Sequence, residues 1–464
     1  MNTVKNDYKY DIDADTNNYL IEETIDSKQS KKLSKRKMNR NNTVHPSQLN
    51  IYSEQSMFDS NSQDKENMMN LDNIKDSTFG ASLNVSKQKT CHNEVYQWMP
   101  GYYKPRVLKY NMQIVFVHWG DTHVAFITDT GHLYTMGSNR YGELGLGDVT
   151  VRSIAYNSMP WLVDELINTK IISVSWGFNH SAAITENHNV VTWGDARYGQ
   201  LGHGTQETLF SPQYVSYFAT NSIKIIEISC GMYHTGFISS TGDIYICGNT
   251  DITGGNVEIR KVSIPEKWCS IKLSDLVNTN FIEPNFQVYG LILTKSGFVY
   301  YLGIDQSNPN IDVVWKIKEL EIYLVKQIAI SSYFAVIADE GELYVWGNSV
   351  IGNFSTPQKI NWIPKAVRSI SLGMNISAWT DSSGMIWAWG ENSQGELGVD
   401  DNQTKDKPYP VMALKSKNVT NLSWGGNFYF AIGSQIKSYG LNSTLVSKSK
   451  FYNSSIIINS KFYV

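Results

Sequence analysis

The chain has 464 residues and a formal net charge of −3, from 40 lysines and arginines against 43 aspartates and glutamates. This balance excludes a nucleic-acid binder that works through bulk positive charge, and no apolar run reaches the ~18 residues that a membrane span needs. The four cysteines contain no Cys-x-x-Cys pair, so we expect a soluble protein of a reducing, intracellular compartment, without a disulfide framework or a zinc site.

Residues 1–97 differ in composition from the rest of the chain. They contain one of the 34 glycines and none of the 13 tryptophans, and they are rich in Asn, Ser, Lys and Asp. They have no sustained strand or helix periodicity, and they have no apolar core of signal-peptide length. Such a segment buries too little apolar surface to offset the entropy of ordering. We therefore expect 1–97 to be a disordered N-terminal tail.

A basic block occupies residues 28–40 of this tail, with seven lysines and arginines and no acid. An exposed block of this kind is typical of a nuclear-targeting sequence read by an import receptor, or of a segment that binds chromatin. The alternative is a charge run that only keeps the tail soluble. We predict nuclear localisation, with the cytoplasm as the alternative. The residues assigned to targeting are Lys31, Lys32, Lys35, Arg36 and Lys37.

From residue 114 onward the sequence repeats a two-part spacing. His123 lies eight residues before Gly131, which lies six residues before Gly137. The same spacing starts again at His180, His234, Tyr289, Tyr333 and Ile376, and a copy two residues shorter starts at Phe428. The units are 43–57 residues apart, a period typical of propellers and solenoids.

Each unit has the pattern of a β-sheet. Short apolar runs are joined by turns such as "STGD", where glycine supplies the positive φ of a hairpin, and proline-containing stretches follow that suit an outer strand. Four strands in each of seven units predict an all-β, seven-bladed propeller over residues 98–440. The last unit has no clear fourth strand, so we expect residues 103–108 to close blade seven. Residues 441–464 form a C-terminal tail.

Three loops carry a more specific signature, namely "SNRYGELGLGD" (138–148), "DARYGQLGHGT" (195–205) and "ENSQGELGVDD" (391–401). With "WGFNHSAAIT", they resemble the regulator of chromosome condensation family of seven-bladed propellers over residues 103–440. Units three, four, five and seven lack the loop, so the chain resembles a divergent member. The best-known member of that family exchanges nucleotide on a Ran-like small GTPase at chromatin.

The repeated residues themselves favour architecture over chemistry. The first position of the repeated spacing holds His123, His180 and His234 in units one to three. We interpret these histidines as hydrogen-bonded structural residues, because they recur at one fixed position. We find no Gly-x-Ser-x-Gly, no His-Glu-x-x-His and no phosphate-binding loop. We therefore predict no catalytic residues, no metal site, no cofactor and no enzyme of covalent or redox chemistry.

Specificity is expected where residues vary on a fixed frame. The pairs just before the histidine position vary from unit to unit, and they lie in the loop between the first and second strands. Their alternative role is to fill the mouth of the central channel. The predicted partner-binding residues are Asp121, Phe178, Asn179, Met232, Tyr233, Met374, Asn375 and Asn427.

These features predict a non-catalytic scaffold for protein–protein interaction, monomeric and without a membrane partner. The alternative is a guanine-nucleotide exchange factor for a Ran-like GTPase, which the resemblance implies. A second alternative is a chromatin-associated binder that acts through the basic block. A stretch at 249–262 contains a Gly-Gly turn and is the candidate for a projecting wedge, although it also fits the outer strand of blade three.

Overall fold

The computed structural model describes residues 93–434 apart from 121, 157, 249–256, 264–265, 278–285, 306–307, 350, 364, 374 and 426–427. The chain divides into two units, Met1–Val85 and Ser86–Val464, and every described residue belongs to the second. The predicted nuclear-targeting residues and the tail 441–464 lie outside the described residues. None of the described helices is long and apolar enough to cross a membrane.

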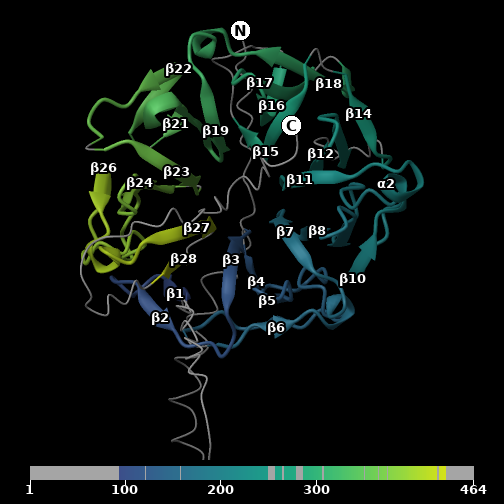
Figure 1. Ribbon diagram of the computed structural model, residues 1–464, viewed down its shortest axis with the longest axis horizontal. Helices are drawn as coiled ribbons and strands as arrows, with labels where there is room; N and C mark the ends of the chain where they lie inside the picture. The colour runs from purple at the N-terminus through teal and green to yellow at the C-terminus, as the bar shows by residue number, and fades with distance from the viewer. Residues whose placement is uncertain are drawn as a thin grey trace, which may run out of the picture. The chain divides into compact units, whose positions relative to one another are not determined.

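Seven four-stranded antiparallel sheets form a ring, which confirms the predicted seven-bladed propeller (Figure 1). We call the strands of each blade a to d from the centre of the ring outward. Blade one contains β3 (Ile114–Trp119), β4 (His123–Thr128), β5 (Leu133–Gly137) and β6 (Trp161–Leu162). Blade two contains β7 (Ile171–Trp176), β8 (His180–Thr185), β9 (Val190–Gly194) and β10 (Leu209–Tyr214). Blade three contains β11 (Ile225–Cys230), β12 (His234–Ser239), β13 (Ile244–Gly248) and β14 (Arg260–Val262).

The remaining blades follow the same order. Blade four contains β15 (Trp268–Val277), β16 (Phe286–Thr294), β17 (Val299–Asp305) and β18 (Asn308–Lys316). Blade five contains β19 (Val325–Ile330), β20 (Tyr333–Ala338), β21 (Leu343–Ser349) and β22 (Gly352–Lys359). Blade six contains β23 (Val367–Leu372), β24 (Ile376–Asp381), β25 (Ile386–Gly390) and β26 (Lys405–Pro410). Blade seven contains β27 (Val419–Gly425), β28 (Phe428–Ser434), β1 (Asn93–Trp98) and β2 (Arg106–Leu108).

Short helical turns follow several outer strands and lead to the next blade. Each buries one large apolar residue, namely Leu166, Phe218, Leu320 or Leu414. The turns are η1 (Asp164–Leu166), α2 (Ser216–Thr220), η2 (Lys318–Leu320) and η4 (Met412–Leu414), and a further turn, η3 (Asp339–Gly341), joins β20 to β21.

The register of the b–c hairpins explains the repeated spacing. His123 pairs with Gly137, and His180 with Gly194, so the two ends of each spacing lie opposite one another. A Cβ at Gly137 would lie 2.5 Å from the carbonyl oxygen of Thr122, so this close approach requires glycine. Unit four departs from the pattern, because a bulge shifts the partner of Gly303 from Tyr289 to Val288.

Blade seven is built from both ends of the described chain. Its order is β2-β1-β28-β27, so two strands come from the N-terminal side and not one. Strand β1 takes the c position, and its residues 93–97 belong to the segment that the sequence analysis placed in the disordered tail. The boundary predicted at residue 98 was therefore wrong for these residues. Strand β1 is short and rich in polar side chains, and its pairing depends on the free edge of β28.

Along the inner strands, side chains of one blade form hydrogen bonds with backbone N–H groups of the next blade. The Ser423 hydroxyl accepts a hydrogen bond from the Trp119 N–H at 2.7 Å, and the Ser175 hydroxyl accepts one from Cys230 at 3.0 Å. Each hydrophobic cluster contains residues of neighbouring blades, such as Ala125 of blade one with Trp193 of blade two. The core is therefore a series of inter-blade layers, which fix the positions of the loops at either face.

Candidate partner-binding face

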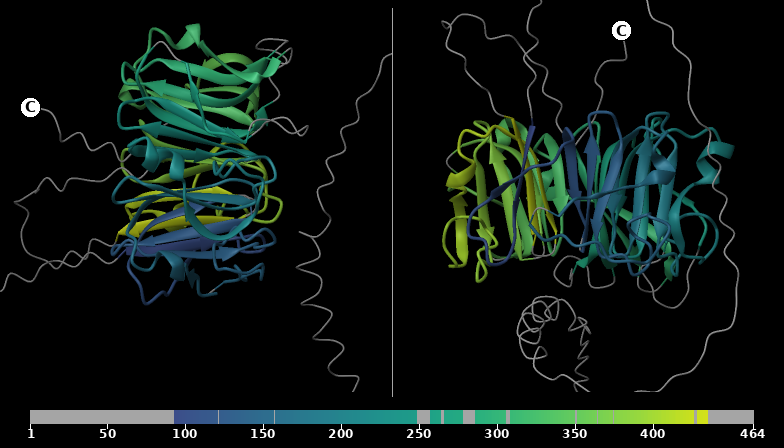
Figure 2. Two further views of the ribbon diagram at one scale, coloured as in Figure 1. Left: turned by 90° about the vertical axis from the view of Figure 1, so that its right-hand side faces the viewer. Right: turned by 90° about the horizontal axis from the view of Figure 1, so that it is seen from below.

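Among the described residues, the a–b and c–d loops lie on one face of the propeller, because strands a and c of a blade run in the same direction. Figure 2 shows the strands running between two faces that carry the loops. Backbone hydrogen bonds join the two loops of one blade, from Ser138 N to Thr122 O at 3.0 Å and from Asp195 N to Asn179 O at 2.9 Å. We call this the ab/cd face.

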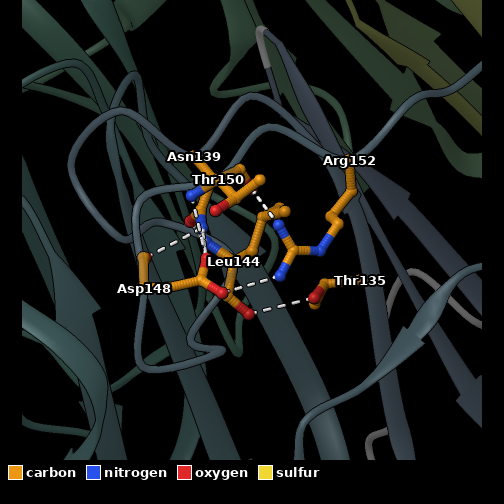
Figure 3. Close-up of polar contacts among 6 residues, drawn as sticks. All are labelled: Thr135, Asn139, Leu144, Asp148, Thr150 and Arg152. Carbon is orange, nitrogen blue, oxygen red and sulfur yellow. Dashed lines mark hydrogen bonds and ion pairs between the residues drawn. The ribbon is translucent and has the colours of Figure 1, made fainter. Parts of the chain in front are cut away.

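An asparagine closes the c–d loop of blade one (Figure 3). The Asn139 amide donates to the carbonyl and carboxylate oxygens of Asp148 at 2.9 and 3.0 Å, and its oxygen accepts from Leu144 N at 2.9 Å. Arg152 binds the same carboxylate at 2.7 Å. Asn392 makes the equivalent contacts in blade six. These side-chain bonds make the loop rigid without regular structure.

The same loops pack on the following blade. The Trp193 indole donates to Glu143 O at 2.8 Å, and the Trp98 indole donates to Glu396 O at 3.0 Å. A Cβ at Gly145 would lie 2.8 Å from Trp193 Nε1. The loop leucines Leu144, Leu201 and Leu397 are buried. The glycine and leucine positions of these loops are therefore structural.

Two residues of each such loop point to the surface, although the turn itself does not require their side chains. In blade two these are Arg197 and Tyr198, which follow the buried Asp195. The carboxylate of Asp195 accepts from Arg197 Nε at 2.9 Å and from Nη2 at 2.8 Å, and this bonding raises the pKa of Arg197 further. The side chain of Gln200 accepts from Tyr198 N at 2.9 Å. The side chain of Arg197 and the backbone of Tyr198 are thus held in place by their own loop.

These residues belong to a row of neighbouring side chains that extends across three blades. The Arg197 guanidinium lies 4.6 Å from the ring centre of Tyr141 and 5.9 Å from that of Tyr198. The Tyr198 ring lies 4.4 Å from that of Tyr233, which lies 6.5 Å from that of Phe178. We call these five residues the arginine–tyrosine ladder. Its four aromatic side chains are half-buried, so each shows part of its surface at the ab/cd face.

The structure brings together some of the residues predicted to bind a partner. Phe178 and Tyr233 are neighbours in the ladder, and Asn179 and Met232 lie beside them in the same loops, half-buried. Asn375 is exposed in blade six, where its amide donates to Glu391 at 3.2 Å. Three predicted residues, Asp121, Met374 and Asn427, lie outside the described residues.

Sequence reasoning missed the other half of the ladder. Tyr141, Arg197 and Tyr198 lie in the c–d loops, whereas the predicted partner-binding residues were all placed in the a–b loops. The available signal was the repeated Arg-Tyr-Gly at 140–142 and 197–199, in which only the glycine is needed for the turn. Blade six has Ser393 and Gln394 at the equivalent positions, so arginine and tyrosine are not required by the loop.

The histidines lie directly beneath this face and are fully buried. His180 Nε2 lies 2.8 Å from the Thr235 hydroxyl. Within the described residues neither ring nitrogen of His123 has a hydrogen-bond partner, so the predicted hydrogen bonding was wrong for this residue. Its ring packs instead edge-on against Trp176, with centroids 4.8 Å apart. Burial lowers the pKa of His123 to about 3 and that of His180 to about 4, so both imidazoles are neutral at pH 7.

The described residues offer no cluster of three or more His, Cys, Asp or Glu side chains placed to hold a metal ion. The buried imidazoles are covered by the a–b loops, and a Cβ at Gly177 would lie 2.2 Å from the His180 ring. Among the described residues, the ladder places one exposed arginine and four half-buried aromatic side chains next to one another on the ab/cd face.

Comparison with known proteins identifies a known repeat in part of the propeller. A family model described as the regulator of chromosome condensation (RCC1) repeat matches residues 130–184, 187–238 and 383–432, and a second model of that description matches 171–200. The chain therefore contains RCC1 repeats. Each of the three matches begins near the b–c turn of blade one, two or six, includes the Gly-x-Leu-Gly loop of that blade and continues into the next blade.

Curated relatives match this chain over only part of their own length. The mouse E3 ubiquitin-protein ligase HERC2 is 25% identical over 67% of this chain and 6% of its own. The Xenopus laevis serine/threonine-protein kinase Nek9 is 25% identical over 62% and 27%. The Arabidopsis thaliana ultraviolet-B receptor UVR8 is 26% identical over 58% and 64%. The chain thus spans less than two thirds of the length of each.

Solved structures share the RCC1 propeller fold at low identity. Human WBSCR16 superposes with a TM-score of 0.61 at 17% identity, over 74% of this chain and 99% of its own. Prp20p from Saccharomyces cerevisiae superposes with a TM-score of 0.60 at 16% identity, over 75% and 93%. These likenesses establish the fold.

Proposed function

We propose that this propeller is a non-catalytic scaffold that binds a protein partner through the arginine–tyrosine ladder. The observation that carries the proposal is the ladder itself, a continuous row of one arginine and four aromatic rings across three blades. Tyrosine and arginine are the residue types that most often dominate the binding energy of protein interfaces.

The rigidity of the loops supports the same function. Before any partner arrives, Asp195 holds the side chain of Arg197 and Gln200 holds the backbone of Tyr198. A partner therefore loses less free energy to the ordering of side chains than it would on a mobile loop. Rigid scaffolds with fixed loops are common sites of recognition.

Affinity purification with variant proteins tests this proposal. The full chain is compared with Tyr198→Ala and Tyr233→Ala, and Gln394→Ala in the equivalent loop of blade six is the matched control. We expect one or more proteins to co-purify with the wild type and the control and to be depleted at least about 10-fold with the ladder variants. Equal recovery in all four would contradict a role for the ladder in binding.

Nucleotide exchange on a Ran-like GTPase is the second candidate function. Prp20p is described as binding Gsp1p and histones, and it shares this fold. Of the candidate wedge 249–262, residues Arg260–Val262 form the outer strand β14, and 249–256 lie outside the described residues. Release of fluorescent GDP from a Ran-like GTPase, with catalytic amounts of the full chain, tests this candidate. Acceleration that is lost when 249–256 is replaced by a Gly-Ser linker supports exchange, and no acceleration excludes it for that GTPase.

Nuclear targeting and chromatin binding by the basic block remain predictions. They are tested together by deletion of residues 1–40, which removes the block and leaves the described propeller intact. Loss of nuclear accumulation supports targeting, and loss of DNA retention with intact partner binding supports the chromatin-binding alternative. Unchanged distribution and retention would show that the block serves only solubility.

A further inference from the structure

The partner's chemistry can be inferred from the charge of the ladder, and this inference rests on the proposed function. Arg197 is the one charged member of the ladder, and its guanidinium already binds the buried carboxylate of Asp195 through two nitrogens. Counted together with Asp195, the ladder therefore carries no net charge. An anionic partner would have to compete with a bidentate ion pair, and a cationic partner would meet no free acid in the ladder.

The aromatic surface of the ladder suits flat, uncharged side chains. Tyr141, Tyr198, Tyr233 and Phe178 are half-buried, so they present ring surface without projecting far from the face. Pyrrolidine rings pack on such aromatic surfaces in the recognition of polyproline II segments. These segments are already extended, so little conformational entropy is lost when they bind.

Two hydroxyl groups are available to an extended backbone. Within the part of the chain that the structure describes, the hydroxyls of Tyr141 and Tyr198 have no hydrogen-bond partner. A polyproline II segment has no internal hydrogen bonds, so its carbonyl oxygens need donors from the binding surface. Tyrosine hydroxyls beside aromatic faces meet both needs of such a segment.

We propose that the arginine–tyrosine ladder binds an extended, uncharged, proline-rich segment of a partner protein. The segment lies across the rings from blade one to blade three, its prolines pack on the tyrosine faces, and its carbonyl oxygens accept from the hydroxyls of Tyr141 and Tyr198. The Arg197 guanidinium lies near the rings of both Tyr141 and Tyr198 and is anchored there by Asp195.

Fluorescence anisotropy with labelled peptides and the full-length chain tests the proposal. The probes are decaproline, a decapeptide of alternating proline and glutamate, a Gly-Ser decapeptide and oligo(dT). We expect decaproline to bind most tightly. Tyr198→Ala lowers its affinity at least about 10-fold, Tyr198→Phe lowers it about 3-fold through loss of the hydroxyl alone, and Gln394→Ala leaves it unchanged. Circular dichroism of each variant verifies that the fold is retained.

Three outcomes would overturn the inference. These are tighter binding of the proline–glutamate peptide or oligo(dT), equal binding of decaproline to Tyr198→Ala, and no binding of decaproline at millimolar concentration. If decaproline fails while ladder variants still lose the co-purified partner, the proposed function stands and only its proline-rich ligand is rejected. If ladder variants lose no partner, the proposed function fails independently of the peptides.

Discussion

At the scale of single residues, the buried histidines beneath the ab/cd face make the stability of the folded protein depend on pH. Burial lowers the pKa of His123 to about 3, and that of His234 to about 3, while the unfolded chain titrates near its ordinary value of about 6.5. Below pH 6.5 the unfolded state therefore binds protons that the folded state does not. The stability present above this pH is lost progressively as the pH falls toward 4.

We predict that the free energy of unfolding decreases between pH 7 and pH 5, by up to about 1.4 kcal/mol per pH unit for each such histidine. His123→Phe should reduce this slope, because phenylalanine does not titrate and stands at the equivalent position 428. Urea denaturation at the two pH values measures the effect. An unchanged slope in His123→Phe would show that this imidazole is accessible to protons in the folded state.

A largely buried ion pair joins blades three and four, with 23% of the Arg260 side chain and 6% of the Asp312 side chain exposed. Arg260 Nη2 lies 3.0 Å from Asp312 Oδ1, and the Tyr289 hydroxyl donates to the same carboxylate. We predict that Asp312→Ala destabilises the chain by about 3–5 kcal/mol, because it leaves Arg260 without a counter-charge. The double variant Arg260→Leu/Asp312→Leu should recover most of this loss. Chemical denaturation measures both, and equal losses would contradict the argument.

At the scale of elements, the c–d loops connect each blade to the next. Gly145 has a φ of +74°, and a Cβ there would meet the Trp193 indole at 2.8 Å. Gly147 has a similar φ of +76°, but a Cβ there would meet only Ser211 Oγ at 3.5 Å. An alanine would cause similar backbone strain at both positions, but only at Gly145 would it also disturb the packing between blades.

We predict that Gly145→Ala destabilises the propeller by about 2–5 kcal/mol and Gly147→Ala by about 1–2 kcal/mol. The difference is the cost of displacing Trp193 from its contact with the preceding loop. Thermal unfolding of both variants measures it. Similar losses at the two positions would mean that the loop tolerates a side chain toward the next blade.

At the scale of the whole propeller, ring closure depends on an N-terminal strand that the C-terminal unit does not supply. Strand β1 pairs with β28 on one side and with β2 on the other, and Tyr96 and Trp98 are buried in the interface with blade six. Closure of this kind removes a free sheet edge and ties distant parts of the chain together.

We predict that deletion of residues 1–90 leaves the melting temperature within a few degrees of the wild type. Deletion of residues 1–98 should lower it by more than about 10 °C or prevent folding, because it removes β1 from blade seven. Differential scanning calorimetry compares the two. Equal melting temperatures would show that β1 is dispensable for closure.

The repeat, the all-β class and the positions of the hairpins could be predicted from the sequence alone. These depend on short-range rules: glycine at turns with positive φ, paired positions fourteen residues apart such as His123 and Gly137, and apolar runs of strand length. They can be read wherever the interacting residues lie close together in the chain.

Only the tertiary structure decided the ladder and the full composition of blade seven. Tyr141 and Tyr233 belong to one row of side chains although 92 residues separate them, because the ring brings the loops of blades one to three side by side. The strand Asn93–Trp98 is too polar and short to be recognised alone, and it forms because β28 offers it a free edge. Contacts of this range depend on the geometry of ring closure, which no local pattern of residues encodes.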